Sequence, residues 1–233
     1  MTGDAIPEDA IDVLDHGFVR LDGVLADDLS VANAARVSFA RRKTELDDSD
    51  EGLIRFLMRD RHGTPFEHNS FRFHVQCPIF VAREWFRHRI SSFNEFSMRY
   101  AKATDEFYVP SPGDVRSQVG KPGAYTFEPV GVELAEQARD EIQAVYDHAF
   151  ATYERLVEAG VARELARTVM PVGAYTQFFW TVNARALMNF VSLRAAPTAQ
   201  LEIRRYADAV EAFFAGRMPV THAAFVANDR TAP

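Results

Sequence analysis

The sequence predicts a single-domain α+β protein, and two observations carry that prediction. Residues 132–159 place apolar side chains at helical spacing over many consecutive turns. Residues 71–75 alternate Phe and Val with polar side chains, and residues 175–182 are rich in aromatics, Thr and Val, which is typical of strands. A length of 233 residues with 47% hydrophobic residues suits one domain with a substantial core, so we treat residues 1–233 as one unit.

Short elements alternate before the first of these strands. Weak alternation over residues 11–25 predicts short strands, and residues 30–37 predict a helix that starts at its serine. We interpret residues 41–51 as a charged loop and residues 53–58 as a short helix. The sequence His-Gly-Thr-Pro at residues 62–65 then breaks the chain.

The longest predicted elements lie in the middle of the chain. A helix over residues 79–86 follows the first strand, with Pro78 in its first turn. Residues 110–131 hold four prolines and four glycines, which predicts a long surface excursion. The long helix over residues 132–159 comes next, and Gly160 is its candidate C-cap.

Three further helices are predicted toward the C-terminus. The first is short and covers residues 163–169. Asn183 caps a helix that runs through Leu193, and Thr198 caps the last helix, which ends at Gly216. We find no internal repeat, low-complexity segment or linker, which agrees with a single domain.

Composition argues against several classes of protein. The net charge is -7, whereas a duplex nucleic-acid binder is usually basic, so we expect no nucleic-acid partner. Cys77 is the single cysteine, which excludes an internal disulfide and a disulfide-stabilised secreted fold. The N-terminus has no apolar signal segment and no apolar run is long enough to span a membrane. We therefore expect a cytoplasmic protein without membrane contact.

Residues 83–100 carry the strongest chemical signal. Arg83 and Arg87 lie four positions apart on one face of the predicted helix, where like charges cost roughly 0.2–0.5 kcal/mol. His88 and Arg89 add positive potential at the helix end, and the following loop supplies hydroxyl, amide and carboxylate groups. The group indicates a site for an anion such as a nucleotide phosphate. A solvated helix end with internal salt bridges explains the same residues equally well.

A second polar group lies on the predicted helix that Asn183 caps. Arg185 and Asn189 are four positions apart and therefore share a face, and Arg194 follows at the helix end. By themselves these residues predict no more than the polar face of a packed helix.

A third group contains His62, Glu67 and His68, with His74 in the next strand. Its spacing does not match the HExxH pattern of zinc enzymes, and Gly and Pro lie between the histidines. Turn capping and hydrogen bonds within the core are therefore favoured, and no metal site is expected. A metal-dependent nucleotide hydrolase that uses His62, Glu67 and His68 is one competing hypothesis.

The strongest signal contains a complete motif. It reads Arg87-His88-Arg89, seven residues, then Ser97-Met98-Arg99. With this motif the chain resembles the flavin-dependent thymidylate synthases, a family unrelated to the thymidylate synthases that use a catalytic cysteine. The resemblance covers about residues 11–215, and three flanking segments are also similar: residues 62–68, 179–185 and 193–194.

The resemblance implies a fold, an assembly and a reaction. The fold is a central, mostly antiparallel sheet with a helical layer that includes one long helix. The assembly is a homotetramer whose active sites lie at subunit interfaces. The reaction is reductive methylation of dUMP to dTMP, with methylenetetrahydrofolate as carbon donor, NADPH as reductant and FAD as hydride carrier.

The resemblance also implies which side chains lie near each ligand, and different subunits would supply some of them. Near FAD it places Thr64, Arg87, His88, Arg89, Glu95, Asn183, Arg185 and Asn189. Around dUMP it places Glu84, Trp85, Phe86, Arg87, Glu95, Phe96, Ser97, Met98, Arg99, Arg167 and Arg194.

Arg194 is the catalytic residue that the resemblance implies. It would polarise the pyrimidine near N3 and stabilise its anionic form. Cys77 sits beside Pro78 at the end of an apolar strand, so we interpret its thiol as packed and inert. Thr198 stands where many members of the family have a histidine, a departure that bears on the folate contact. The alternative function is an arginine-rich module that binds a nucleotide or RNA without turnover.

Overall fold

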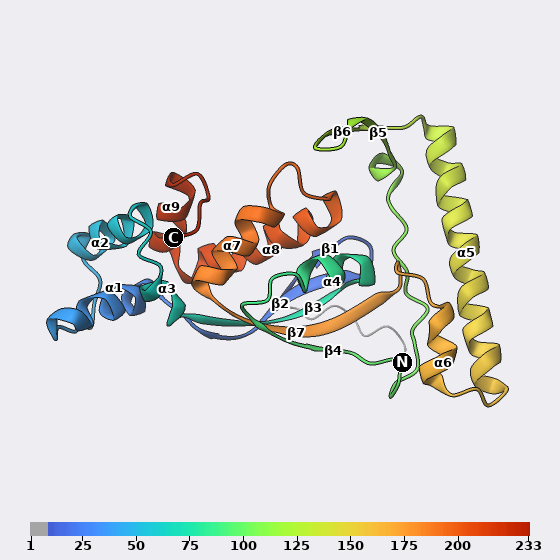
Figure 1. Ribbon diagram of the computed structural model, residues 1–233, viewed down its shortest axis with the longest axis horizontal. Helices are drawn as coiled ribbons and strands as arrows, with labels where there is room; N and C mark the ends of the chain where they lie inside the picture. Colours follow the sequence, from blue (N-terminus) through green and yellow to red (C-terminus); the bar gives the residue numbers. More distant parts are fainter. Residues whose placement is uncertain (1–8) are drawn as a thin grey trace.

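A five-stranded antiparallel sheet forms the centre of the computed structural model (Figure 1). The structure describes residues 9–233. The prediction that the N-terminus has no signal segment rests partly on residues 1–8, which lie outside the described residues. In the sheet the strands follow the order β1-β2-β3-β7-β4, and every neighbouring pair is antiparallel. The predicted α+β class and antiparallel sheet are confirmed. The strands are β1 (Ala10–Val13), β2 (Gly17–Leu25), β3 (Ser70–Pro78), β4 (Ser92–Glu95) and β7 (Tyr175–Asn183).

Helices cover one face of this sheet and extend from both of its ends (Figure 1). Helices α4, α7 and α8 lie over the strands, α1 to α3 lie at one end, and α5 and α6 lie at the other. The α-helices are α1 (Asp28–Arg36), α2 (Asp48–Arg59), α3 (Thr64–Glu67), α4 (Ile79–Trp85), α5 (Val132–Glu158), α6 (Arg163–Ala166), α7 (Ala184–Arg194), α8 (Leu201–Arg217) and α9 (Pro219–Ala227). Short 3-10 helices are η1 (Val37–Phe39), η2 (Pro112–Asp114) and η3 (Arg167–Val169).

Aromatic side chains fill the core between the sheet and the helices above it. Phe73 of β3 stacks on Trp180 of β7 with 5.5 Å between ring centroids. Trp85 of α4 stacks on Phe190 of α7 at 4.7 Å, and both residues are fully buried. Stacked and edge-on rings of this kind add stability beyond the apolar area that they bury. The end of α4 is therefore held firmly against α7.

The long helix α5 is confirmed, yet it does not lie on the sheet (Figure 1). It packs with α6 in a separate small cluster around Tyr153 and Ala166. Apolar side chains elsewhere on the helix remain in solvent: Val132, Leu134 and Val145 are 71%, 55% and 59% exposed. Much of the apolar face that the amphipathic pattern predicts for α5 is therefore exposed to solvent in this chain.

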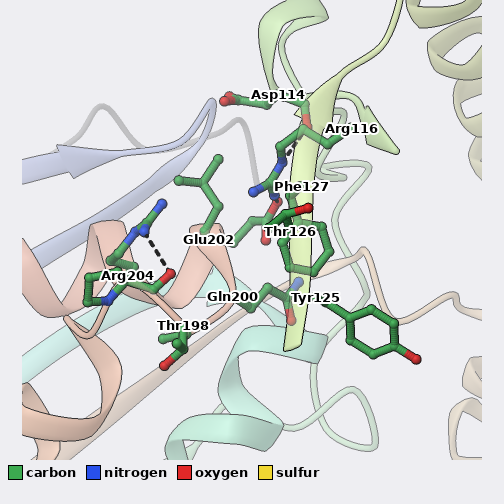
Figure 2. Close-up of a pocket in the computed structure, with 12 residues that line it drawn as sticks. Asp114, Arg116, Tyr125, Thr126, Phe127, Thr198, Gln200, Glu202 and Arg204 are labelled. Carbon is green, nitrogen blue, oxygen red and sulfur yellow. Dashed lines mark hydrogen bonds and ion pairs between the residues drawn. The ribbon is translucent and has the colours of Figure 1, made fainter. Parts of the chain in front are cut away.

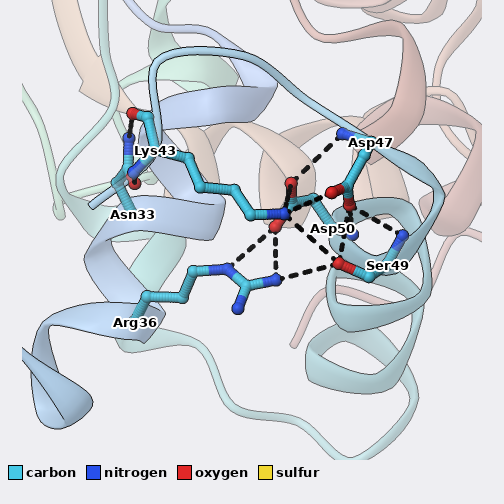
Figure 3. Close-up of polar contacts among 6 residues, drawn as sticks. All are labelled: Asn33, Arg36, Lys43, Asp47, Ser49 and Asp50. Carbon is cyan, nitrogen blue, oxygen red and sulfur yellow. Dashed lines mark hydrogen bonds and ion pairs between the residues drawn. The ribbon is translucent and has the colours of Figure 1, made fainter. Parts of the chain in front are cut away.

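The predicted charged loop is partly wrong, because α2 already begins at Asp48. Asp47 caps this helix, and Asp47 and Asp50 complete a capping box. Figure 3 shows how Lys43 and Arg36 converge on the fully buried Asp50. The Lys43 ammonium lies 2.8 Å from Oδ2 of Asp50, and the Arg36 Nε donates to Oδ1 at 2.8 Å. This network ties the charged segment to α1 and α2.

Two predictions for the N-terminal half need correction. The first helix begins at Asp28 rather than at the serine, because Asp27 is its N-cap and accepts a hydrogen bond from the Ser30 amide at 2.6 Å. Helix α4 ends at Trp85, so Arg83 and Arg87 do not share a helical face. The loop expected after this helix contains the edge strand β4, which pairs with β7.

The C-terminal half follows the prediction more closely. Asn183 caps α7 through the Ala186 amide, and Gly160 has φ of 86° just beyond α5, as expected for a C-cap. Thr198 is not a cap, because Gln200 holds the N-cap position of α8 and has no side-chain cap hydrogen bond. The segment over 110–131 is on the surface as expected, and it contains a hairpin of β5 (Arg116–Lys121) and β6 (Ala124–Pro129). Helix α9 was not predicted.

Candidate active site

Arg194 is the centre of the most constrained polar cluster among the predicted site residues. It ends α7, and Glu84 lies near the end of α4 directly beside it. The Arg194 Nη1 donates to Oε2 of Glu84 at 2.8 Å, and Nη2 donates to the Glu84 carbonyl at 3.1 Å. These side chains are 19% and 27% exposed. The aromatic contact between α4 and α7 fixes the backbone of both partners.

His88 completes this cluster on the third nitrogen of the guanidinium. The Arg194 Nε donates to the His88 Nε2 at 3.0 Å. The His88 ring also meets the Phe190 ring edge-on, with centroids 5.0 Å apart. Burial, followed by the positive charge of Arg194, lowers the pKa of His88 to about 4. The imidazole is therefore neutral at physiological pH.

The second half of the motif lies along the strand β4 and the turn that follows it. Glu95 accepts a hydrogen bond from the Thr176 hydroxyl at 2.8 Å. Ser97 accepts one from the Arg99 amide at 3.3 Å, which shapes the turn. The half-buried Met98 packs against the cluster of α5 and α6. Phe96 is half-buried, and its amide donates to the Gln177 carbonyl at 2.8 Å.

Two predicted dUMP residues meet at one glutamate that the sequence did not single out. The Arg99 Nη2 lies 3.4 Å from Oε2 of Glu164, and the Arg167 Nε donates to the Glu164 carbonyl at 3.4 Å. The guanidinium of Arg99 also lies 5.5 Å from the centre of the Tyr100 ring. Both arginines are exposed, so each retains donors for an anion. No spacing rule links Arg99 to residues so far along the chain.

Three of the eight predicted flavin residues, Thr64, Asn183 and Arg185, lie where α3 meets the start of α7. Arg185 donates to Oε1 of Glu67 at 2.6 Å and to the Pro233 carbonyl at 2.7 Å. A Cβ atom on Gly63 would lie 2.4 Å from the Arg185 Nε, so a glycine is required for this close approach. Thr64 is exposed nearby.

Asn183 and Asn189 differ in what they offer a ligand. Asn189 is exposed on the same face of α7 as Arg185, as the spacing predicts. The side-chain oxygen of Asn183 is already engaged as the cap of α7. Arg87 and Arg89 of the motif are also exposed.

Two aromatic residues in the predicted dUMP set pack into the protein instead. Trp85 has no exposed surface and is surrounded by aromatic rings, so its side chain cannot contact a bound nucleotide. Its assignment to the substrate site stays a prediction, and only a contact through the backbone could fulfil it. Phe86 is half-buried against Phe93 and Phe178, with centroids 4.7 and 5.0 Å apart. Its neighbours indicate a packing role.

The predicted site residues do not line one cavity in a single chain. Helix α3 with Thr64 and helix α6 beside Arg167 lie toward opposite ends of the longest axis (Figure 1). The Arg194 cluster lies at the junction of α4 and α7, between those two ends. Any site that uses all three groups must therefore combine surfaces from more than one chain or undergo a large rearrangement.

Two cavities among the described residues lie away from the motif. One of about 750 Å³ lies between the hairpin and the start of α8 and is lined by Thr198 (Figure 2). In it the Arg116 guanidinium lies 5.4 Å from the Phe127 ring centre and 3.7 Å from the buried Glu202 carboxylate. Another of about 550 Å³ lies near η2 and is lined partly by Arg139 and Arg205.

Cys77 lies in the core, whereas His62, Glu67 and His68 are exposed. Cys77 is fully buried, and burial followed by the negative charge of Glu95 raises the pKa of its thiol well above the usual value.

Within residues 9–233 no three His, Cys, Asp or Glu side chains are grouped as metal ligands. Glu67 instead binds Arg185, and the ring of His62 lies 5.5 Å from that of Phe56. The hydrolase hypothesis is therefore unsupported.

Among the helices of the described residues, none combines the length and the apolar composition needed to cross a bilayer.

Known proteins match this chain over nearly its whole length. A family model described as thymidylate synthase complementing protein, Thy1, matches residues 21–220. A flavin-dependent thymidylate synthase of Thermosipho melanesiensis is 47% identical over 214 residues, 92% of each chain. One of Thermotoga neapolitana is 47% identical over 216 residues, 93% of this chain and 94% of the relative.

A solved structure extends the match to three dimensions. It is the UMP/dUMP methylase PolB from Streptomyces cacaoi bound with 5-Br dUMP, which aligns with a TM-score of 0.88 at 44% identity. The alignment covers 96% of this chain and 100% of that chain. The fold, the motif and the relatives agree, and the chain belongs to the Thy1 family of flavin-dependent thymidylate synthases.

Proposed function

We propose that this protein reductively methylates dUMP to dTMP without a covalent cysteine intermediate. Methylenetetrahydrofolate is the carbon donor, NADPH is the reductant and FAD is the hydride carrier. The observation that carries the proposal is the Arg194 cluster, because it offers a preorganised donor to a pyrimidine. The solved methylase with a bound dUMP analogue supports the choice of nucleotide.

Arg194 would act through directed hydrogen bonds more than through net charge. An arginine has five N–H donors, and this one uses three of them on Glu84 and His88. The Glu84 carboxylate compensates the positive charge at 2.8 Å. The two remaining N–H groups are fixed in the guanidinium plane. Donors that are already oriented stabilise developing negative charge on a pyrimidine oxygen without reorganisation.

The alternative route through a thiol has no support in this chain. Cys77 is buried and its raised pKa keeps it protonated, whereas a nucleophilic cysteine must form a thiolate. Ser97 lies in the turn after β4, where its hydroxyl accepts a backbone hydrogen bond. Its role in the proposal is to bind the nucleotide phosphate together with Arg99 and Arg167.

The residues assigned to FAD suit that group chemically. Arg87, Arg89 and Arg185 are exposed cations, and arginine is well suited to a pyrophosphate. Thr64 and Asn189 add exposed hydroxyl and amide groups. FAD supplies the hydride when it is bound. The chain's own contribution is to offer exposed donors in two places, Arg185 at the start of α7 and Arg87 and Arg89 in the motif segment.

We further propose that the enzyme is a homotetramer with active sites shared between subunits. Two observations support sharing: the site residues form three separated groups, and apolar side chains are exposed beside them. Ile90 of the motif segment is 77% exposed, and Leu193 next to Arg194 is 56% exposed. Exposed apolar patches of this kind mark protein–protein contacts.

The first test is the visible absorption spectrum of the purified protein, followed without oxygen on adding NADPH and then dUMP. A flavin spectrum that bleaches, with dTMP formed after folate is supplied, supports the proposal. A colourless protein that also fails to take up FAD contradicts it. Binding of dUMP or RNA without turnover would then favour the alternative binding module, and steep salt dependence would identify the RNA version.

Sharing of the site is tested by mixing two inactive variants, Arg194→Ala and Arg99→Ala, through co-expression. If the two arginines of one site come from different subunits, random assembly restores about a quarter of the sites. If both come from one subunit, mixing restores nothing. Light scattering on the wild-type protein measures the assembly independently.

UMP is a second candidate substrate, because the matching solved methylase was also determined with 5-Br UMP, at a TM-score of 0.87. Competing dUMP and UMP in one assay gives the ratio of their kcat/KM values. A ratio near one would establish a dual methylase, and strong preference for dUMP would restrict the function to thymidylate synthesis.

A further inference from the structure

The contact between Arg194 and His88 determines which imidazole nitrogen carries the proton. Arginine can only donate, so the His88 Nε2 at 3.0 Å from the Arg194 Nε must accept. A neutral imidazole that accepts at Nε2 carries its hydrogen on Nδ1. The geometry therefore defines both the charge and the tautomer of His88.

The surroundings of His88 favour the same state. The ring is half-buried against Phe190, and the nearest charge is the positive guanidinium of Arg194. Both effects oppose a second proton on the ring. His88 thus remains an acceptor at neutral pH.

Three contacts on three nitrogens restrain the guanidinium more than two can. Glu84 alone holds Nη1 and Nη2, both at the far end of the side chain. The hydrogen bond to His88 adds Nε, at the near end. Together they restrain the plane of the group and leave one N–H on each terminal nitrogen.

We infer that His88 is a positioning residue for Arg194, which it holds in the plane needed to meet the pyrimidine. This inference rests on the proposed function. It gives His88, the middle residue of the Arg-His-Arg motif, a different role from the one that the family resemblance implies. The family resemblance places His88 near FAD, whereas its Nε2 here serves the catalytic arginine. Only the Nδ1–H of the ring is left for another partner.

The test compares His88→Gln with His88→Met in the FAD-loaded enzyme. Both replacements are unbranched and of similar length, but only glutamine has an oxygen that can accept from the Arg194 Nε. We expect His88→Met to lower kcat by about 10- to 100-fold, the range for a lost hydrogen bond to a charged group. His88→Gln should recover at least tenfold of that loss. FAD content and the KM for dUMP should change little in either variant.

Equal kcat values in the two variants would overturn the inference. It would also be overturned if both variants lost FAD and regained normal turnover when FAD was added back. The first result would mean that the acceptor is irrelevant. The second would mean that His88 serves the cofactor instead of Arg194.

A second measurement does not depend on activity. Nitrogen NMR of protein labelled with ¹⁵N-histidine separates the tautomers, and His88→Gln identifies the His88 signals among the seven histidines. We expect an unprotonated Nε2 from pH 8 to pH 5. A proton on Nε2, or titration near pH 6.5, would refute the inference. If the wild-type protein makes no dTMP, the proposed function fails, and this spectrum still decides the contact.

Discussion

Two arginine–carboxylate clusters in this molecule have opposite characters. In the cluster around Asp50 the carboxylate is fully buried, and Lys43, Arg36 and the Asp47 amide occupy both of its oxygens (Figure 3). The three Lys43 donors are all used within the cluster. In the cluster around Arg194 the arginine is the central group, and two of its five donors have no partner among residues 9–233.

The difference shows how a structural ion pair can be told from a functional one. A network built around a buried carboxylate whose two oxygens are both occupied stabilises the fold, as at Asp50, where Arg36 uses only its Nε and Nη2. A network that restrains a cation and leaves some donors open is prepared for a ligand. Substitutions in the two clusters should therefore differ, with the larger effect on activity at Arg194 and on stability at Asp50.

The largest effect is expected from Arg194→Ala. Loss of a preorganised donor should lower dTMP formation by about 10²–10³-fold, while flavin remains bound. Steady-state assays with absorbance spectra measure both. Arg217→Ala is the matched control, because Arg217 is an exposed arginine at the end of α8. Near-normal turnover of Arg194→Ala would remove the catalytic role of this cluster.

Asp50→Asn should instead affect the fold. It leaves two cations facing a neutral group, but Arg36 and Lys43 are 19% and 30% exposed and retain some solvent. We therefore expect the free energy of unfolding to fall by about 2–3 kcal/mol, below the value for a fully buried broken pair. Urea denaturation measures it, with the exposed Asp48→Asn as control. Unchanged stability would show that the network contributes nothing net.

Acid should weaken the two clusters in different pH windows. The folded pKa of His88 is about 4, below its usual 6.5, so its contribution is complete above pH 6.5 and is lost between pH 6.5 and 4. Burial opposes ionisation of Asp50, but hydrogen bonds from Lys43 and Arg36 outweigh it and lower the pKa below 3.8. Its contribution is lost only below pH 3.8.

Unfolding measured at pH 7, 5 and 3 tests these windows. One pKa unit corresponds to about 1.4 kcal/mol, and for half-buried His88 we expect a total of about 1–2 kcal/mol. His88→Gln should flatten the change between pH 6.5 and 4, whereas Asp50→Asn should flatten only the change at lower pH. The same response in both variants would contradict the assignment.

The smallest effect is expected from Cys77→Ala, which alters neither cluster. Turnover should stay within about twofold, and stability should fall by about 1 kcal/mol through loss of packing. A folded variant without activity would mean that the chemistry depends on the thiol, and that the donors of Arg194 are insufficient.

Elements with a clear periodic pattern were predictable from sequence, and elements without one were not. Strands β3 and β7 and the helix α5 have clear periodicity, and the structure contains all three. The hairpin of β5 and β6 is exposed at nearly every position, so no alternation marks it. The last predicted helix ends at Gly216, close to the observed end of α8, but Pro219 then begins α9, in whose first turn a proline is tolerated.

The candidate site was predictable as a set of residues but not as an arrangement. The motif identified Arg87 to Arg99, and the family resemblance added Arg194. Contacts such as Glu84 with Arg194, 110 positions apart, come from the packing of α4 on α7, which periodicity does not contain. Trp85 lies within the motif segment and is nonetheless part of the core. Position in a motif therefore does not establish contact with a ligand.

Helix α7 links the flavin residues at its start to the catalytic arginine at its end. Arg185 and Arg194 are separated by nine residues, which is about 13 Å of helix and two and a half turns. One inserted residue would turn Arg194 by about 100° and remove it from Glu84 and His88. The exposed hairpin tip around Gly123 can change in length without such a cost. Related sequences should thus vary in length in the hairpin and keep a constant length between Asn183 and Arg194.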